Sequence, residues 1–487
     1  MHEINRVRPI QLAKCVFALS VGLVATILAS SPVEASPVVS PPISIKANCS
    51  VDVSSVMQHW LSSLPASTTV DIPAGACYLV DEGLKLIGSQ GLTISGGAWD
   101  DATVPQPNGE PQALNPVFWF VGGSNITLEN LSITGVNPGG YHPAGAFIAG
   151  IRSDGVTGLN LSNITIDNVY GDGIELAPLR AQGDVGSTIL NPTTDATISD
   201  INISGSGRQG ITLASVNNAL ISSVRLAHVG IDVFDLEADQ WNEGARNVTI
   251  DGCVAGADNG ALFFANGGSG GGGNWTQNIT VENCAMSTQE AGDAVLIQTP
   301  ADQPKPRGPF TFSNDTLRCG ASVYVACVQV TGADVSINQS SLIIPPGTVH
   351  EAAYNATDGS TVALNGDSVS GYGTAGSVDR SSSVSVSSGT WTPFEPVATG
   401  SHPPSLPPPS TPGPTGAPPI GPVGHPVASP LIASRPASVT SAPDAPVTTG
   451  QSVGPGSSSL VKESGKADNG LGTGSGRVRR SSSKAGV

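Results

Sequence analysis

The sequence has few cationic residues, and this scarcity limits its partners. The chain has 487 residues, with 21 Lys and Arg against 38 Asp and Glu. Residues 47–394 hold ten basic and thirty-two acidic side chains, a formal charge of 10 − 32 = −22. Because like charges repel, this acidic body argues against nucleic acid and anionic membrane as partners.

A second long apolar run is also missing, so no membrane span is expected. The one run, residues 15–29, follows the basic residues Arg6, Arg8 and Lys14 and is short for a bilayer. Small residues at 33–35 offer a cleavage position. Residues 1–35 are therefore predicted to be a secretory signal peptide, and the protein is expected to be secreted, extracellular and monomeric.

Zinc-site motifs are absent, since the chain has no C-x-x-C pair and no His/Cys cluster. An even number of cysteines follows residue 35, which in an exported chain favours disulfides. Apolar periodicity is missing from residue 395 onward, where Pro, Ser and Gly dominate. The chain is thus predicted to comprise a linker over 36–46, a folded body over 47–394 and a disordered tail over 395–487.

A nine-residue pattern recurs along the body, as in NITLENLSI from Asn125 and GLNLSNITI from Gly158. Apolar residues mostly occupy its second, fourth, seventh and ninth places, which is typical of two short strands. Residues that mostly tolerate a left-handed turn stand between them: Asn130, Asn163, Asp200, Ser223, Gly252, Asn283 and Asn314. Each unit is predicted to be strand, one-residue bend, strand.

A third strand follows in most units, and it begins with glycine: GIRS at Gly150, GIEL at Gly173, GITL at Gly210, GIDV at Gly230 and GALF at Gly260. The units recur every twenty-three to thirty-seven residues, and no stretch between them has helical periodicity. Three short strands per turn at this spacing predict an all-β solenoid whose stacked units share one core.

These features resemble the right-handed parallel β-helix of the pectin-lyase-like superfamily. The likeness covers about residues 49–386, and residues 70–97 resemble the first coils of that family. The segment VSSVMQHWLSSLP, residues 53–65, resembles its short N-terminal capping helix. The resemblance implies a single-stranded right-handed parallel β-helix, but it implies no one function, because the superfamily includes lyases, hydrolases, epimerases, tailspikes and adhesins.

Stacked units of this kind would bring cysteines that are distant in the sequence close enough to form disulfide bonds. Cys253 and Cys284 hold the same place in successive units, within disulfide reach of strands about 4.8 Å apart. They form either a disulfide or a pair of buried thiols. Two further pairs are plausible: Cys49 with Cys77 would pin the N-terminal cap to the first coil, and Cys319 with Cys327 would close a short loop.

Aligning the third strands places one outward side chain on each rung: Arg152, Glu175, Thr212, Asp232 and Leu262. Glu175 and Asp232 would then lie two rungs apart, roughly 9–10 Å at the backbone. That spacing is compatible with the acid and base of an inverting glycosidase, whose carboxyls lie about 6.5–9.5 Å apart. The catalytic candidates are Asp172, Glu175, Arg208 and Asp232.

Long connections after the third strands should form one wall of a groove. Aromatic rings there would pack on sugar C–H groups, and acids would accept hydroxyl hydrogens. The candidates for substrate binding are Tyr141, His142, Arg152, Tyr170, His228, Asp235, Glu237, Trp241 and Trp275. Asp235, Glu237 and Asp239 stand at alternate positions, so they either bind Ca²⁺ through oxygen ligands or are solvated.

Structural interpretations compete with these roles. Asp172 and Asp232 can cap turns, Arg152 and Glu175 can form a surface ion pair of little worth, and His228 can be a solvated turn residue. The polygalacturonase motif GHG and the epimerase motif DPHE are absent, and no pair of adjacent aspartates falls in a rung. We therefore expect a protein that binds extracellular or cell-wall polysaccharide and cleaves or modifies it as a lyase or glycoside hydrolase. The alternative is a non-catalytic glycan-binding or structural cell-surface protein.

Overall fold

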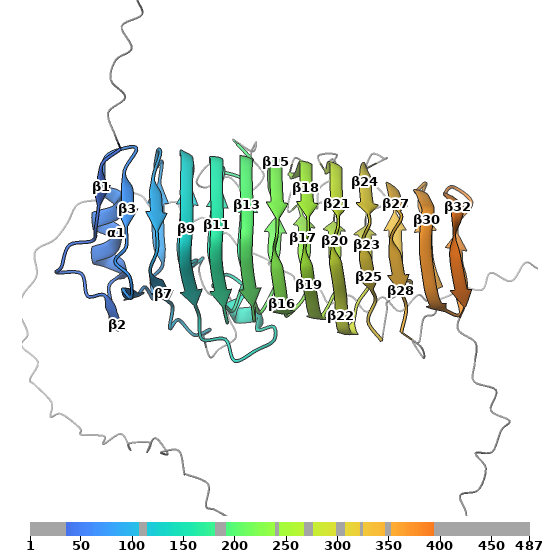
Figure 1. Cartoon of the computed structure of the whole chain (residues 1–487), viewed down its shortest axis with the longest axis horizontal. Coiled ribbons are helices and arrows are strands. Elements are labelled where there is room, and N and C mark those ends of the chain that lie inside the picture. Colours follow the sequence, from blue (N-terminus) through green and yellow to red (C-terminus); the bar gives the residue numbers. More distant parts are fainter. Residues whose placement is uncertain are drawn as a thin grey trace, which may run out of the picture. The chain divides into compact units, whose positions relative to one another are not determined.

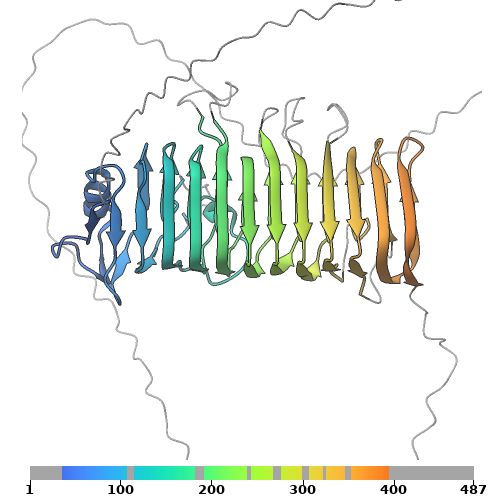
Figure 2. The same ribbon diagram turned by 45° about the horizontal axis from the view of Figure 1, so that its top comes forward.

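The computed structural model describes residues 36–106, 114–180, 191–238, 243–266, 276–298, 307–321, 325–345 and 352–393. In this part of the chain, parallel strands wind in successive coils that stack from one end to the other (Figure 1). The turned view shows the same row of coils from a second side (Figure 2). The predicted all-β solenoid is confirmed.

Eleven strands form one continuous face, here called sheet B. They are β5 (Leu84–Ile87), β8 (Phe118–Val121), β10 (Ile151–Asp154), β12 (Ile174–Ala177), β14 (Ile211–Leu213), β17 (Phe234–Glu237), β20 (Phe263–Asn266), β23 (Val295–Gln298), β26 (Val328–Thr331), β29 (Ala352–Thr357) and β31 (Thr374–Val378). Each coil contributes one of them, the third strand of its unit.

The remaining strands form sheet A, which covers two faces because its longest strands pass through a bend. They are β1 (Val38–Val39), β2 (Asn48–Asp52), β3 (Thr69–Asp71), β4 (Cys77–Leu79), β6 (Thr93–Ser95), β7 (Ala98–Asp100), β9 (Ser124–Thr134), β11 (Thr157–Asp167), β13 (Thr193–Ser204), β15 (Ser215–Ser222), β16 (Arg225–Val229), β18 (Gly244–Asp251), β19 (Val254–Asn259), β21 (Gln277–Glu282), β22 (Ala285–Ala291), β24 (Arg307–Ser313), β25 (Thr316–Arg318), β27 (Ala333–Asn338), β28 (Ser341–Ile343), β30 (Thr361–Tyr372) and β32 (Ser383–Pro393).

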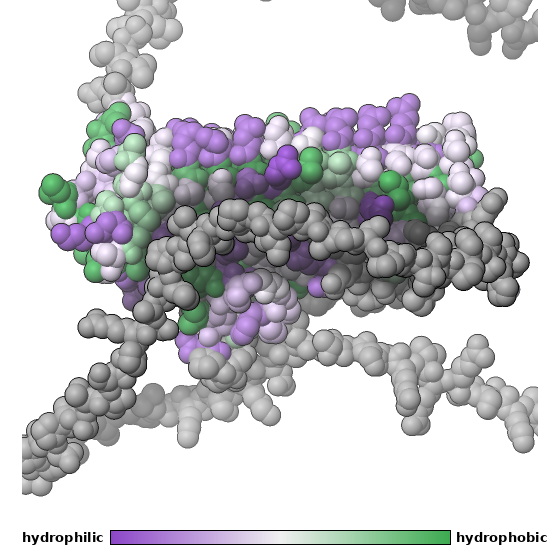
Figure 3. Space-filling model, turned by 60° about the horizontal axis from the view of Figure 1, so that its bottom comes forward, coloured by the Kyte–Doolittle hydropathy of each residue, from purple (hydrophilic) through white to green (hydrophobic). Residues whose placement is uncertain are grey.

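The one-residue bends have the predicted left-handed conformation, with φ of 58° at Asn130, 51° at Asn163 and 54° at Asp200. Asparagine side chains also bond from coil to coil, since Asn163 Nδ2 donates to Asn130 Oδ1 at 2.9 Å. On the face shown in Figure 3, hydrophilic residues form a row along the upper rim, parallel to the stack. The bends therefore fix where each strand turns and keep successive turns in line.

Alternate side chains of each strand point into the coil and stack on their equivalents in the next. In β9 the buried residues are Ile126, Leu128, Leu131 and Ile133, and each pairs with a buried residue of β11. Three further coils, with strands β27, β30 and β32, follow the last unit identified from the sequence. The core is thus one continuous column of apolar side chains.

The N-terminal end is closed by helix α1 (Ser54–Ser62), where the capping helix was predicted. Its Met57 and Leu61 are buried in the core. Strand β1 lies inside the segment expected to be a linker and pairs with β3. No helix in the described residues is long and apolar enough to cross a membrane.

All three expected disulfides are formed. They join Cys49 to Cys77, Cys253 to Cys284, and Cys319 to Cys327. The interpretation of Cys253 and Cys284 as two separate thiols is therefore wrong. The first bridge links β2 to β4 and so fastens the N-terminal end to the coil that follows it.

A substitution at Asn163 tests the role of the left-handed bend. N163V and N163G both lose the hydrogen bond to Asn130, but only valine strains the bend. We expect N163V to be less stable than N163G by about 1–2 kcal/mol, the cost of a left-handed conformation for a residue with a Cβ atom. Urea unfolding followed by circular dichroism measures the difference. The control is S162V in the same strand, and equal stability of N163V and N163G would contradict the argument.

Candidate functional site

Sheet B presents one outward side chain per rung, and its order differs from the predicted one. Arg152 pairs with Glu175 and Glu175 with Thr212, as expected. Thr212, however, pairs with Asp235. The next outward residue is Phe264, the partner of Asp235. The predicted places of Asp232 and Leu262 on this ladder are wrong.

The core explains the error. The segments GIDV and GALF resemble the earlier third strands in sequence, but β17 begins at Phe234 and β20 at Phe263. In the structure Phe234 and Phe263 stand at the inward position, and both are fully buried. Phe263 was expected to point inward, whereas Phe234 takes the inward place expected for Ile231 and Val233. Asp235 and Glu237 consequently lie in a strand, not in the loop predicted to hold them.

Asp232 belongs to a second column, at the corner just before sheet B. The amide of Gly173 donates to the carbonyl of Gln209, and the amide of Gly210 donates to that of Asp232. These bonds place Asp172, Gln209 and Asp232 at equivalent positions of three successive coils. The ladder and this corner column together make one polar surface.

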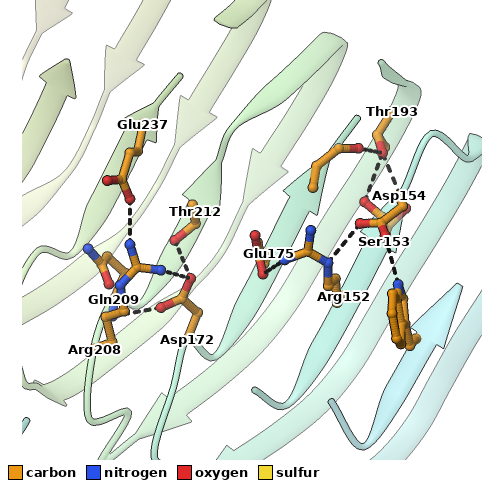
Figure 4. Close-up of polar contacts among 12 residues, drawn as sticks. Arg152, Ser153, Asp154, Asp172, Glu175, Thr193, Arg208, Gln209, Thr212 and Glu237 are labelled. Carbon is orange, nitrogen blue, oxygen red and sulfur yellow. Dashed lines mark hydrogen bonds and ion pairs between the residues drawn. The ribbon is translucent and has the colours of Figure 1, made fainter. Parts of the chain in front are cut away.

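Arg208 is the centre of that surface (Figure 4). Its guanidinium lies 3.2 Å from Asp172 Oδ2 and donates a second bond to Glu237. Asp172 also accepts hydrogen bonds from Thr212 Oγ1 at 2.8 Å and from the backbone amide of Gln209 at 3.2 Å. Asp172 is only 1% exposed, so it holds Arg208 in place and does not itself face a ligand.

A second ion-pair group lies two rungs away on the same face (Figure 4). Arg152 pairs with Glu175 and with Asp154, whose Oδ1 lies 2.8 Å from the guanidinium. The indole of Trp119 donates to Asp154 at 2.8 Å, and the ammonium of Lys85 lies 3.7 Å from the ring centre. Asp154 and Trp119 were missed. Extending the ladder backward to FWFV, the sequence of β8, would have found Trp119.

The surface has more acids than cations. Six carboxyls (Asp154, Asp172, Glu175, Asp232, Asp235 and Glu237) face three cationic groups (Lys85, Arg152 and Arg208), which gives a formal charge of 3 − 6 = −3 if every carboxyl is ionised. Burial raises the pKa of Glu175 to about 7, although Arg152 opposes the shift. Burial likewise raises the pKa of Asp232 to about 7. Protonated carboxyls therefore persist here near neutral pH, where an ordinary carboxyl is ionised.

Asp235 lies beneath the surface formed by its neighbours. It is fully buried, and burial together with the nearby Glu237 holds its pKa well above the usual range. Its Oδ2 accepts a bond from Gln209 Nε2 at 2.8 Å. Its Oδ1 has no hydrogen-bond partner within the described residues. A protonated Asp235 fits this site, because ionising it would add a buried negative charge beside Glu237 and Asp232, which outweighs the attraction of Arg208.

Four side chains remain open to a ligand. The exposed fractions are 33% for Glu237, 21% for Arg208, 15% for Glu175 and 14% for Arg152. Glu175 has the features of a proton donor, since it is partly exposed and its pKa is near neutral. Glu237 is the most exposed acid and is oriented by Arg208. The arrangement thus offers an acid and a base on one face.

The structure describes a second group of predicted binding residues at the corner before sheet B. Tyr141 is 43% exposed, whereas Tyr170 is buried. The rings of His142 and Tyr170 meet edge to face, with their centres 6.0 Å apart. Gly145 packs against the Tyr170 ring, so the tyrosine supports this loop.

Some predicted residues do not join the surface. His228 lies on β16 of sheet A with a φ of 52°, and its Nδ1 is 3.6 Å from Asp258. Its side chain is two-thirds exposed, which fits the interpretation as a solvated turn residue. Trp241, Trp275 and Asp239 lie outside the described residues.

Of the three proposed Ca²⁺ ligands, Asp235 and Glu237 do not fit a cation, and Asp239 lies outside the described residues. Asp235 Oδ2 already accepts from an amide, and Glu237 is paired with Arg208, whose charge stands where a cation would be needed. The three-donor group found in the described residues is Cys49, Cys77 and Asp100, and its cysteines form a disulfide.

Removing the Arg208 guanidinium should unbalance the site. R208M leaves the buried Asp172 without its cation, so we expect the free energy of unfolding to fall by about 3 kcal/mol. Urea unfolding measures this loss. The control is R225M, which removes an exposed arginine of β16 and should change stability little. Equal losses in the two variants would show that the pair to Asp172 is not stabilising.

Glu175 should make stability depend on pH. Its pKa rises from 4.5 to about 7 on folding, so the folded state binds the proton more tightly. The resulting stabilisation is complete below pH 4.5 and is lost as the pH rises through about 7. E175Q should therefore lose less stability than the wild type between these two values, when unfolding is measured at a series of pH values. A steeper decline in E175Q would contradict the assignment.

No family model and no curated protein matches this chain. The A-module of the mannuronan C-5 epimerase AlgE6 from Azotobacter vinelandii is similar in structure, with a TM-score of 0.50 and 13% identity over 72% of this chain and 98% of that chain. The adhesin PfbA of Streptococcus pneumoniae has a TM-score of 0.47, with 10% identity over 74% of this chain and 92% of its own.

The endo-xylogalacturonan hydrolase from Aspergillus tubingensis has a TM-score of 0.41 and 13% identity, over 73% of this chain and 93% of its own. At such identities a structural likeness shows the fold and no activity. Stacked parallel coils, the helical cap and the likeness to the epimerase module lead to one conclusion. The chain has the right-handed parallel β-helix fold.

Proposed function

We propose that this protein is exported, binds a polysaccharide across the outer face of sheet B, and hydrolyses a glycosidic bond there. The observation that carries the proposal is Glu175, a partly exposed carboxyl whose pKa lies near neutrality. It shares its face with Arg208 and Glu237, which supply a fixed base. Glycoside hydrolysis requires one carboxyl that donates a proton and a second carboxylate that accepts one or attacks the sugar.

The roles follow from exposure and pairing. Glu175 gives its proton to the leaving glycosidic oxygen as the bond from that oxygen to the sugar carbon breaks. Glu237 takes a proton from the water whose oxygen forms the new bond to that carbon. Their strands lie two rungs apart, roughly 9–10 Å along the stack, and Glu237 stands two residues beyond Asp235, the residue aligned with Glu175, so the two backbones are roughly 12 Å apart. The carboxyl separation of inverting enzymes, about 6.5–9.5 Å, therefore requires the two side chains to reach toward each other. Asp172 and Asp235 act as positioning residues, because both are buried.

Charge favours hydrolysis over β-elimination. Elimination from a uronate needs a cationic group to stabilise the substrate carboxylate as the proton is removed. Both guanidiniums here are already paired, Arg152 with Glu175 and Asp154, and Arg208 with Asp172 and Glu237. A neutral polysaccharide is therefore the proposed substrate.

Non-catalytic glycan binding is the second candidate. One observation favours it: both guanidiniums are held by carboxyls, as in a rigid polar scaffold. A binding face of this kind would present fixed hydroxyl partners to a sugar without transferring a proton. The two candidates differ in whether Glu175 exchanges its proton with the substrate.

The test uses the purified full-length chain on a panel of pectins, alginates, xylans, mannans and host glycans. We expect new reducing ends without the ultraviolet absorbance of unsaturated uronates. E175Q should lower the rate about 10²–10⁴-fold, the contribution of a general acid, and leave binding unchanged. R225M, on sheet A, is the control. New absorbance would show β-elimination, and binding without any products would favour the non-catalytic candidate.

A further inference from the structure

A hollow of about 300 Å³ lies beside the acidic surface, next to the start of β20. Its lining includes Asp232, Asn259, Gly260, Phe264, Leu296 and Gln298. This volume is at the lower end of the range for small-molecule sites, about 300–1,000 Å³. The hollow uses residues that the proposed acid–base chemistry does not.

Two glycines keep this corner free of side chains. Gly260 has a φ of 147°, and a Cβ atom there would lie 2.3 Å from the Ile231 carbonyl oxygen and 2.9 Å from Asp232 Oδ1. Gly292, at the same place in the next coil, also has a φ of 147°, and its Cβ would lie 1.7 Å from the Gly260 oxygen. Both conditions require glycine. The backbones of successive coils therefore approach each other closely at this corner, beside Asp232.

The lining is apolar on one side and polar on the other. Phe264 is half-buried on the outer face of β20, and Leu296 stacks on it from β23. Asp232 accepts the Ala261 amide at 2.6 Å through Oδ1 and is 9% exposed. Gln298 and Asn259 are exposed at the rim. A sugar ring has this same division, with C–H groups on its faces and hydroxyls at its edge.

The position of the hollow relates it to the proposed reaction. Phe264 is one rung beyond Asp235 and three rungs beyond Glu175. At about 4.8 Å per rung, it lies roughly 14 Å from the rung of Glu175. A glycan running along the stack would reach both places, whereas a disaccharide at Glu175 would not.

We infer that the hollow is a sugar-binding subsite, distant from the cleaved bond, which holds a neutral pyranose of a longer chain. Phe264 packs on the ring, and Asp232 and Gln298 bond its hydroxyls. The inference rests on the proposed function, because it takes the polysaccharide to lie along sheet B. The subsite predicts that affinity depends on the length of the glycan, which the acid–base residues alone do not predict.

The test measures affinity by calorimetry on the full-length protein, with hexasaccharides and disaccharides of xylose, mannose, glucose and galactose as probes. F264A should raise the Kd of the hexasaccharide that binds the wild type about tenfold, the worth of one ring contact. The disaccharide of the same sugar should bind F264A and wild type alike. Q298A, at the exposed rim, should weaken the hexasaccharide about fivefold without affecting the fold.

The control is L220A, which removes an exposed apolar side chain of sheet A and should leave both affinities unchanged. A hexasaccharide that binds the wild type, F264A and Q298A equally would overturn the subsite and leave the proposed function standing. A wild type that neither binds nor cleaves any probe would overturn both. Equal weakening of both chain lengths would also overturn the subsite, since it would mean a general loss of structure.

Discussion

The fixed spacing between stacked strands is the constraint on which the structure depends. Each coil bonds to the next through parallel ladders, so every side chain has an equivalent one rung away, about 4.8 Å distant. The left-handed bends at Asn130, Asn163 and their equivalents keep the strands of all coils in line. A coil that slipped by one residue would turn its apolar side chains to solvent, and the core forbids it.

The same spacing builds the polar surface. Asp172, Arg208 and Glu237 come from three coils and are far apart in sequence, yet the stack places them within ion-pair distance. The close packing of these groups also raises the pKa of two carboxyls. Because Glu175 and Asp232 are surrounded by other groups and largely shielded from water, their carboxyls hold protons near pH 7. The scaffold thus supplies both the positions and the chemistry of the site.

The sequence predicted what depends on short-range pattern. The bends, the capping helix and the pairing of Arg152 with Glu175 and Glu175 with Thr212 follow from local letters and appear as expected. It did not predict where β17 begins. The start of the strand depends on which side chain fills the core. In the structure Phe234, and no residue of GIDV, takes the inward position aligned with Ile211. A volume comparison across neighbouring coils would be needed to foresee it.

Long-range partners were equally beyond the pattern. Nothing in the local sequence shows that Asp154 would receive the Trp119 indole, or that Arg208 would reach Glu237 from another coil. The corner glycines Gly260 and Gly292 give no signal until the coils are stacked, when each is seen to face the backbone of its neighbour. Such features become predictable only once the register is known.

The most direct test of this account is the titration of Glu175 itself. With selectively labelled glutamate, the carboxyl carbon resonance can be followed by NMR against pH and assigned by its loss in E175Q. The account predicts a midpoint near pH 7, because burial outweighs the attraction of Arg152. A midpoint near 4.5, the ordinary value, would show that Glu175 is ionised at neutral pH and is no proton donor.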